Sequence, residues 1–295
     1  MQIGIDLGAT KIESVVLEKD GSEVQRNRVD SPKNYHKTLE VITNIVNNIE
    51  KKYKKELDVG VCHPGSSNLD TGLIQNAFNS PWLNNQNFVN DISKNLNRKI
   101  YCENDANCFA LSEAYDGSAK NHKTVFGIIL GSGCGGGLII NKKILIGPNA
   151  FTGEWGHIPI GKPDNKNNIE EYISGKGLER QFYSKYKKNL TAKQIFENAR
   201  LNSTNEIEFI NEFKSNLARC LSLIINMIDP DAIVFGGGLS NEIDSLDQIK
   251  DITEKYLSNF NNIEKINLKT SFLKPKHGDA SGVRGAAILS RQNSI

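Results

Sequence analysis

The sequence lacks several features that would place a protein in a broad functional class. It has no run of about 18 apolar residues, the length that a membrane-spanning helix requires. Its 36 basic and 34 acidic residues give a net charge of only +2, which argues against a nucleic-acid binder. The first residues, MQIGIDLG, do not have the pattern of a secretory signal. We therefore expect a cytoplasmic protein without membrane or nucleic-acid partners.

Cysteine is scarce and is not spaced for metal or redox chemistry. The five cysteines are an odd number, and no pair has C-x-x-C spacing, so reduced thiols are expected. The chain also lacks a G-x-x-x-x-G-K-[ST] loop, and no G-x-G-x-x-G lies in its first strand-to-helix turn. A nucleotide would therefore bind through other loops. The 295 residues suffice for one large domain or two ordinary ones.

Apolar periodicity predicts a mixed α/β fold that is rich in hairpins. Strands at 2–7, 11–18 and 23–29 form an antiparallel meander. A second strand–glycine turn–strand unit at 124–130 and 136–140 repeats the arrangement, which suggests two similar domains. We also expect strands at 57–62, 100–103, 144–147 and 232–238, and helices at 37–54, from Asn104-Asp105, at 206–228 and from about 281.

Three glycine turns follow apolar strands, and their small residues would let backbone N–H groups approach an anion. In the first turn, Thr10 adds a hydroxyl, Lys11 adds a positive charge, and Asp6 could hold Mg²⁺ directly or through water. The second turn lies at 131–137, and the third, at 236–238, could pass under an adenine or ribose. A plain hairpin turn and a flexible loop are the alternatives for the first two.

Two polar segments suit sugar chemistry. In ENDAN, at 103–107, a carboxylate at a strand-to-helix junction could act as a general base, although an N-cap is the more common role there. In GEWGH, Glu154 and His157 lie three residues apart between glycines and could bind one polyol. Neither segment defines a site by itself.

Taken in order, these segments resemble the ROK family (repressors, open reading frames and sugar kinases). The resemblance covers essentially the whole chain, and NAFNSPWLN at 76–84 looks most like the bacterial fructokinase/mannokinase branch. The matching segments are DLGATK at 6–11, PG at 64–65, ENDAN at 103–107, GSGCGGG at 131–137, FTGEWGH at 151–157, IEEYISG at 169–175, DPDAIVFGGG at 229–238 and HGDASGVRGAA at 277–287.

The resemblance implies an actin-like ATPase fold, built from two ribonuclease-H-like domains with ATP and sugar in a central cleft. We expect one domain over 1–117 and 280–295, and the other over 118–279. The family's members are commonly homodimers, so a homodimer with sugar and ATP-Mg²⁺ as its small-molecule partners is expected.

The resemblance also implies roles for individual residues. Asp105 matches the catalytic base, which takes the proton of the attacking sugar hydroxyl, and it belongs to the sugar-binding set. The other sugar-binding matches are Gly65, Ser66, Asn104, Glu154, His157 and Glu170. The matches on the nucleotide side are Asp6, Gly8, Thr10, Lys11, Gly131, Ser132, Gly133, Gly236 and Gly237.

Two segments depart from the family pattern. The usual DxGGTK is DxGATK here, with Ala9 in place of the second glycine. After His157, the family's cysteine-rich zinc loop is replaced by IPIGKPDNKNNIEE, in which Asn168 stands at the position of the last cysteine and Glu170 is retained. Because one histidine cannot form a tetrahedral structural site, we predict no zinc. The loop would be held by packing, or be mobile.

Together these features predict an ATP-dependent sugar kinase that phosphorylates a hexose hydroxyl, O6 in most of the family. Fructose or mannose is the expected acceptor. A kinase for N-acetylglucosamine or glucose is the alternative, and so is a sugar-binding pseudokinase. A repressor of the same family would need a helix-turn-helix ahead of the first phosphate turn, and this turn already begins at residue 6.

Overall fold

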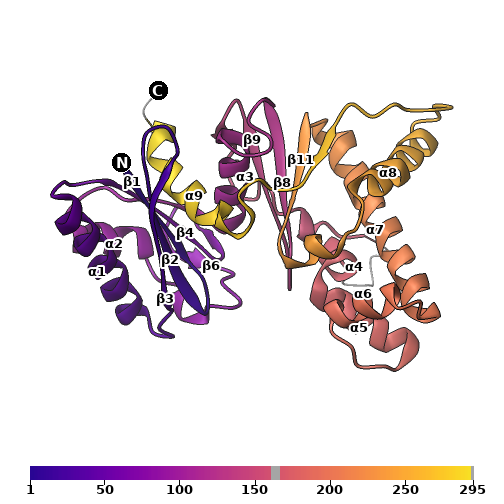
Figure 1. The fold of residues 1–295 in the computed structure, drawn as a ribbon, viewed down its shortest axis with the longest axis horizontal. Coiled ribbons are helices and arrows are strands. Elements are labelled where there is room, and N and C mark those ends of the chain that lie inside the picture. Colours follow the sequence, from indigo (N-terminus) through magenta and orange to yellow (C-terminus); the bar gives the residue numbers. More distant parts are fainter. Residues whose placement is uncertain (161–166, 294–295) are drawn as a thin grey trace. The chain divides into compact units, whose positions relative to one another are not determined.

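The computed structural model of this protein describes residues 1–160 and 167–293, which divide into two compact units (Figure 1). Unit 1 comprises Met1–Lys120, Gly137–Thr152 and Lys276–Ile295, and unit 2 comprises Asn121–Gly136 and Gly153–Pro275. The chain therefore passes from one unit to the other after Lys120, Gly136, Thr152 and Pro275. Unlike the predicted domains, these units group 137–152 with the N-terminal segment.

The sheet of unit 1 has the strand order β3-β2-β1-β4-β7. The predicted antiparallel meander is confirmed, whereas β4 and β7 continue the sheet in parallel with β1. The carboxyl ends of these three parallel strands share one edge, the usual place for ligands in such sheets. The strands are β1 (Gln2–Leu7), β2 (Lys11–Leu17), β3 (Glu23–Asp30), β4 (Asp58–His63) and β7 (Tyr101–Asn104).

Helices cover both faces of this sheet. Alternate residues of β1, among them Ile3 and Ile5, join the buried apolar side chains of α1 and α2 in one core cluster. On the other face, Val15 and Leu17 of β2 pack against Val283 and Ala287 of α9. Figure 1 shows α9 running alongside this sheet. The helices are α1 (Tyr35–Tyr53), α2 (Phe88–Leu96), α3 (Asp105–Tyr115) and α9 (Ser281–Ile288), and the short elements are β5 (Ser66–Ser67), β6 (Ile74–Gln75), η1 (Pro81–Leu83), η4 (Gly278–Ala280) and η5 (Leu289–Asn293).

The second sheet has the order β10-β9-β8-β11-β12, and the boundary between the units falls within β9. β11 pairs in parallel with both β8 and β12. The predicted strand at 136–140 begins two residues earlier, so the second glycine turn is limited to 131–133. The strands are β8 (Thr124–Leu130), β9 (Cys134–Ile140), β10 (Lys143–Ile144), β11 (Ala232–Gly236) and β12 (Ser271–Leu273).

Unit 2 contains a long helix, α7 (Thr204–Ile228), where the apolar spacing predicted one. Its buried stripe includes Phe213, Leu217 and Leu221. The C-cap is Asp229, whose backbone is in the left-handed region and which precedes a proline. The other helices are η2 (Trp155–His157), α4 (Ile169–Ile173), α5 (Gly175–Tyr186), α6 (Ala192–Arg200), η3 (Gly238–Glu242) and α8 (Leu246–Phe260).

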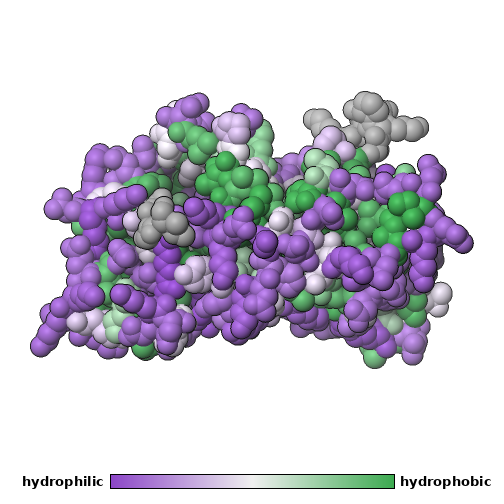
Figure 2. Space-filling model, turned by 90° about the horizontal axis from the view of Figure 1, so that it is seen from above, coloured by the Kyte–Doolittle hydropathy of each residue, from purple (hydrophilic) through white to green (hydrophobic). Residues whose placement is uncertain are grey.

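The surface is largely hydrophilic on the face drawn in Figure 2, with hydrophobic side chains gathered in patches. Within residues 1–160 and 167–293, no helix combines the length and the hydrophobicity of a membrane-spanning segment.

Candidate active site

The first phosphate turn joins β1 to β2. The N–H of Gly8 donates to the carbonyl of Lys11 at 3.0 Å, and a Cβ at Gly8 would lie 2.8 Å from that oxygen. Only glycine therefore closes the turn this tightly. Gly8 and Ala9 are partly buried, whereas Thr10 and Lys11 are exposed. The predicted contacts Gly8, Thr10 and Lys11 thus form one compact turn.

Asp6 lies on β1 just before this turn and is partly buried. Burial raises the pKa of its carboxyl, which a hydrogen bond with Cys62 offsets only in part. Among the described residues, no Lys, Arg or His forms an ion pair with it. A desolvated carboxylate without a paired cation fits Mg²⁺, which proteins usually hold through one or two carboxylates together with substrate phosphates.

The second turn, Gly131–Gly133, follows β8 in unit 2 and is held from three directions. The N–H of Gly131 donates to the carbonyl of Gly133 at 2.9 Å. At the start of α5, the N–H of Gly175 donates to the carbonyl of Gly131 at 2.7 Å. The carboxylate of Glu170 accepts from the N–H of Cys134 at 2.8 Å and would collide with a Cβ at Gly133. A residue predicted to bind sugar therefore also supports this turn.

The third glycine turn follows β11. Gly237 has φ +85°, and a Cβ there would lie 2.3 Å from the carbonyl oxygen of Leu130, so glycine is required. The turn and Gly131–Ser132 border a cavity of about 480 Å³. Gly238, the residue that follows the predicted contacts Gly236 and Gly237, lines this cavity. The complete lining is Gly131, Ser132, Gly175, Lys176, Glu179, Thr191, Ala192, Lys193, Gly238, Leu239 and Glu242.

Several of these lining residues were not among the sequence-predicted contacts. Lys176 and Glu179 lie on α5 and form an ion pair at 2.7 Å, and Lys193 lies on α6. The only sequence signal for this part of the cavity wall is the matching segment IEEYISG, which ends one residue before Lys176. The wall also contains Glu179 and Glu242, so it presents charges of both signs rather than a positive surface.

Asp105 is the first residue of α3 and is exposed. The sequence left open whether this carboxylate caps the helix. In the structure the cap is Asn104, whose side chain accepts from the N–H of Asn107 at 2.7 Å. Asp105 lies one position further on, where its Oδ1 accepts from the N–H of Ala106 at 2.8 Å. The cap function and the proposed base therefore belong to neighbouring residues.

Gly65 and Ser66 follow β4 closely in the chain, and they lie near Asn104 because His63 of β4 pairs with Asn104 of β7. Gly65 has φ +78°, and a Cβ there would lie 2.3 Å from the carbonyl of Gln75. Ser66 begins β5 and pairs with Gln75 of β6. The predicted sugar contacts of unit 1 thus gather at one edge of its sheet, beside Asp105.

The sugar contacts predicted in unit 2 come from η2 and α4. His157 Nδ1 lies 3.3 Å from Glu154 Oε2, and both side chains are at least partly exposed. Between them, Trp155 is buried, donates its indole N–H to the carbonyl of Gly135 at 2.9 Å and packs edge-on against Phe126. The buried tryptophan therefore anchors the backbone of η2, the element that carries His157 and directly follows Glu154.

The segment without cysteines, after His157, lies partly outside the described residues. Its flanks are joined by a bridge between Pro159 and Asn168 and by the N–H of Ile169, which donates to the carbonyl of Ile158 at 3.0 Å. Asn168 caps α4 by accepting from the N–H of Glu171 at 3.1 Å. Hydrogen bonds thus hold the described flanks, and the absence of zinc stays a prediction.

The structure distributes the candidate residues over both units. Unit 1 holds Asp6, the first turn, Gly65, Ser66, Asn104 and Asp105, whereas unit 2 holds the second and third turns, Glu154, His157 and Glu170. In each sheet a glycine turn joins two neighbouring strands, β1 to β2 in one and β8 to β9 in the other. The chain shares its fold, the actin-like ATPase fold, with solved ROK kinases. The chain belongs to the ROK family, whose model matches residues 2–293.

The comparisons with individual proteins extend over the whole chain. N-acetyl-D-glucosamine kinases from Yersinia enterocolitica and Pectobacterium atrosepticum are 34% and 36% identical, and each alignment covers 98% of this chain and 98–99% of the relative. A ROK family glucokinase from Streptomyces griseus, solved with glucose and AMPPNP, is 25% identical, with a TM-score of 0.79 and 99% of both chains covered. A ROK hexokinase from Thermus thermophilus has a TM-score of 0.84 at 20% identity, covering 98% of this chain and 97% of its own.

Proposed function

We propose that this protein is an ATP-dependent hexose kinase whose acceptor is N-acetylglucosamine. The observation that carries the proposal is the likeness along nearly the whole chain to relatives that are named N-acetyl-D-glucosamine kinases. These names favour the alternative that the sequence left open over fructose or mannose. The intact set of candidate polar residues supports a kinase rather than a sugar-binding pseudokinase.

Asp105 is the general base of the proposed reaction. Its carboxylate accepts the proton of the sugar hydroxyl, O6 in the proposal, while that oxygen forms a bond to the γ-phosphorus of ATP. The bond from this phosphorus to the bridging oxygen breaks, and ADP leaves with the electron pair. Asp105 then releases the proton to water. Its exposed position at the start of α3 supports this role.

The glycine turns hold the nucleotide in this proposal. Their backbone N–H groups bind the phosphates, and the cavity bordered by the second and third turns takes the nucleoside. Asp6 would hold the Mg²⁺ that accompanies ATP, and this ion would supply positive charge against the phosphates. Glu154, His157, Glu170, Asn104, Gly65 and Ser66 bind and orient the sugar.

The test is ADP release measured over a panel of N-acetylglucosamine, glucose, mannose and fructose. We expect the highest kcat/KM for N-acetylglucosamine, with its 6-phosphate as the product. Higher kcat/KM for fructose or mannose would return the assignment to the fructokinase branch. Sugar binding in calorimetry without turnover on any sugar would identify a pseudokinase.

A further inference from the structure

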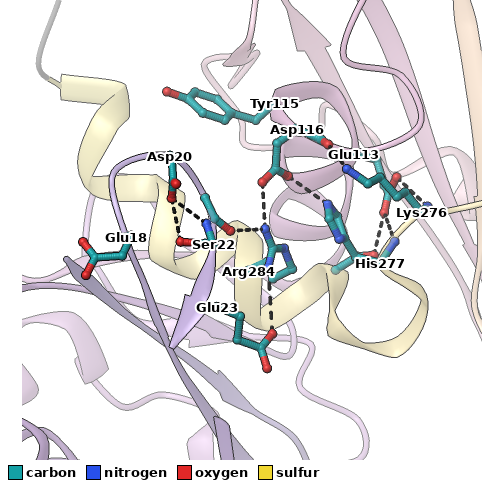
Figure 3. Close-up of polar contacts among 12 residues, drawn as sticks. Glu18, Asp20, Ser22, Glu23, Glu113, Tyr115, Asp116, Lys276, His277 and Arg284 are labelled. Carbon is teal, nitrogen blue, oxygen red and sulfur yellow. Dashed lines mark hydrogen bonds and ion pairs between the residues drawn. The ribbon is translucent and has the colours of Figure 1, made fainter. Parts of the chain in front are cut away.

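A buried carboxylate joins two of the segments through which the chain passes between the units. Glu113 lies on α3 and is completely buried. One segment, Gly117–Lys120, leads out of unit 1, and the other, beginning at Lys276, leads back into it. Figure 3 shows Lys276, His277 and Glu113 close together. We call these two segments the outgoing crossing and the returning crossing.

Five hydrogen bonds reach the Glu113 carboxylate, and both crossings supply donors. From the outgoing crossing, Ser118 donates its N–H at 2.8 Å and its hydroxyl at 3.1 Å. From the returning crossing, Lys276 and His277 donate their N–H groups at 2.9 and 3.2 Å. The fifth donor is the hydroxyl of Ser281 at 2.8 Å. One oxygen of this carboxylate, Oε2, accepts hydrogen bonds from both crossings.

Neighbouring groups strengthen this junction. Asp116, at the end of α3, accepts from His277 Nε2 at 2.9 Å and from Arg284 Nη2 at 2.7 Å (Figure 3). A Cβ at Gly117 would lie 2.3 Å from the Glu113 carboxylate, so the outgoing crossing is pressed against it. Charge, hydrogen bonding and close packing therefore fix both crossings to the carboxyl end of α3.

The same helix begins with Asp105, eight residues before Glu113, or about 12 Å along the axis. We propose that Glu113 is a positioning residue, which fixes the helix that carries the general base to the two chain crossings. This inference rests on the proposed function of Asp105. Glutamine at this position keeps the shape of the side chain but turns one acceptor into a donor facing other donors, so the junction should open.

The test compares Glu113→Gln with a matched control, Glu206→Gln. Glu206 is also a buried glutamate on a helix, but it lies on α7 in unit 2, and its partners Ser203 and Lys188 belong to that unit as well. Because a small displacement of a catalytic group can cost about 100-fold, we expect Glu113→Gln to lower kcat by about 10- to 100-fold. In Glu113→Gln the KM for ATP should stay within about twofold, because the displaced group is the base and not a nucleotide contact. Glu206→Gln should keep kcat within about twofold, because it leaves the base in place.

Amide hydrogen exchange gives a readout that does not depend on activity. In Glu113→Gln, exchange should accelerate in both crossings, at 117–120 and 276–281, whereas Glu206→Gln should leave both unchanged. An unchanged kcat in Glu113→Gln, equal losses of kcat in both variants, or acceleration in neither crossing overturns the inference.

Two further outcomes remain decisive. If Glu113→Gln does not fold, Ser118→Ala removes one hydroxyl donor and should show the same changes at smaller size. No change in that variant contradicts the inference. If the wild-type protein phosphorylates no hexose, the proposed function fails, and the exchange experiment alone decides whether Glu113 holds the crossings together.

Discussion

Two adjacent residues at the start of α3 have different tasks. Asparagine and aspartate are both favoured caps, so the sequence could predict a helix start at 104–105 but not which residue caps it. Asn104 takes the cap position, and Asp105 becomes the first helical residue. In the same way, the sequence showed Asn168 only as a missing cysteine, whereas the structure makes it the cap of α4.

Substitution of Asn104 separates capping from sugar binding. Asn104→Ala should lower the free energy of unfolding by about 1 kcal/mol, because the N–H of Asn107 loses its acceptor. Asn104→Ser retains a capping oxygen and should lose clearly less. Both variants should raise the KM for the sugar, since both remove the amide. Urea denaturation and steady-state kinetics measure the two effects. Equal stability losses in both variants would refute the cap assignment.

Glu113 also predicts a pH dependence of stability. Burial raises the pKa of its carboxyl, but the hydrogen bonds from Ser118, Lys276, Ser281 and His277 outweigh burial and leave the pKa below its ordinary value of 4.5. A carboxyl whose pKa is lowered by folding stabilises the fold above its unfolded pKa, and this contribution is lost as the pH falls through the folded pKa.

We therefore expect the wild-type protein to have a higher free energy of unfolding than Glu113→Gln. This difference should be largest above about pH 5 and should shrink as the pH falls below 4.5. The other titratable groups are the same in both proteins, so the difference isolates Glu113. Urea denaturation at a series of pH values measures it. A difference that is constant from pH 7 to pH 3 contradicts the assigned contacts.

At the scale of elements, α9 approaches its neighbours through glycines. A Cβ at Gly285 would lie 1.8 Å from the carbonyl of Cys108 in α3, and one at Gly60 of β4 would lie 1.9 Å from the carbonyl of Ala286. The sequence predicted a helix here, but spacing along one segment carries no information about which backbone lies against it. The close packing of α3, α9 and β4 is therefore a finding of the structure alone.

Gly285→Ala tests this packing. The added methyl group has no room between two helix backbones, so we expect a loss of about 1–3 kcal/mol in the free energy of unfolding. Gly238→Ala is the control for stability, because nothing lies within 4 Å of a Cβ there. Thermal and urea denaturation compare the two variants. A control that loses as much stability as Gly285→Ala would contradict the packing argument.

Elements differed in how well the sequence predicted them. The regular apolar spacing of α7 predicted 206–228, and the structure gives Thr204–Ile228. By contrast, α5 begins with Gly-Lys-Gly, and glycine disfavours helix, so local propensity gave no signal. The strand β12 has only three residues, too few to show a period. Tertiary contacts decide such segments, and one of them, α5, supplies part of the cavity wall.

At the scale of the whole molecule, motif order along the chain predicted the family and the fold, because glycine turns and polar junctions are local features. The choice of sugar was harder to predict, because a local motif does not show which distant segments would contact the sugar. The names of the relatives favour N-acetylglucosamine over the expected fructose or mannose. The homodimer and the cytoplasmic location stay predictions, and sedimentation analysis tests the first.

Metal removal has a distinct expected outcome. EDTA should abolish ADP release, and added Mg²⁺ should restore it, because Mg²⁺ accompanies ATP. The purified protein should contain well below one zinc per chain, since no cysteine follows His157 in the shortened loop. Elemental analysis measures this content. One tightly bound zinc per chain would show that the prediction of a zinc-free loop is wrong.

The most direct measurement of the central claim is the turnover of Asp105→Asn with N-acetylglucosamine and ATP-Mg²⁺, together with calorimetric binding of both substrates. An amide keeps the size of the side chain but accepts no proton, so kcat should fall by about 100- to 10,000-fold while both affinities change little. A variant that turns over as fast as the wild-type protein would contradict Asp105 as the base.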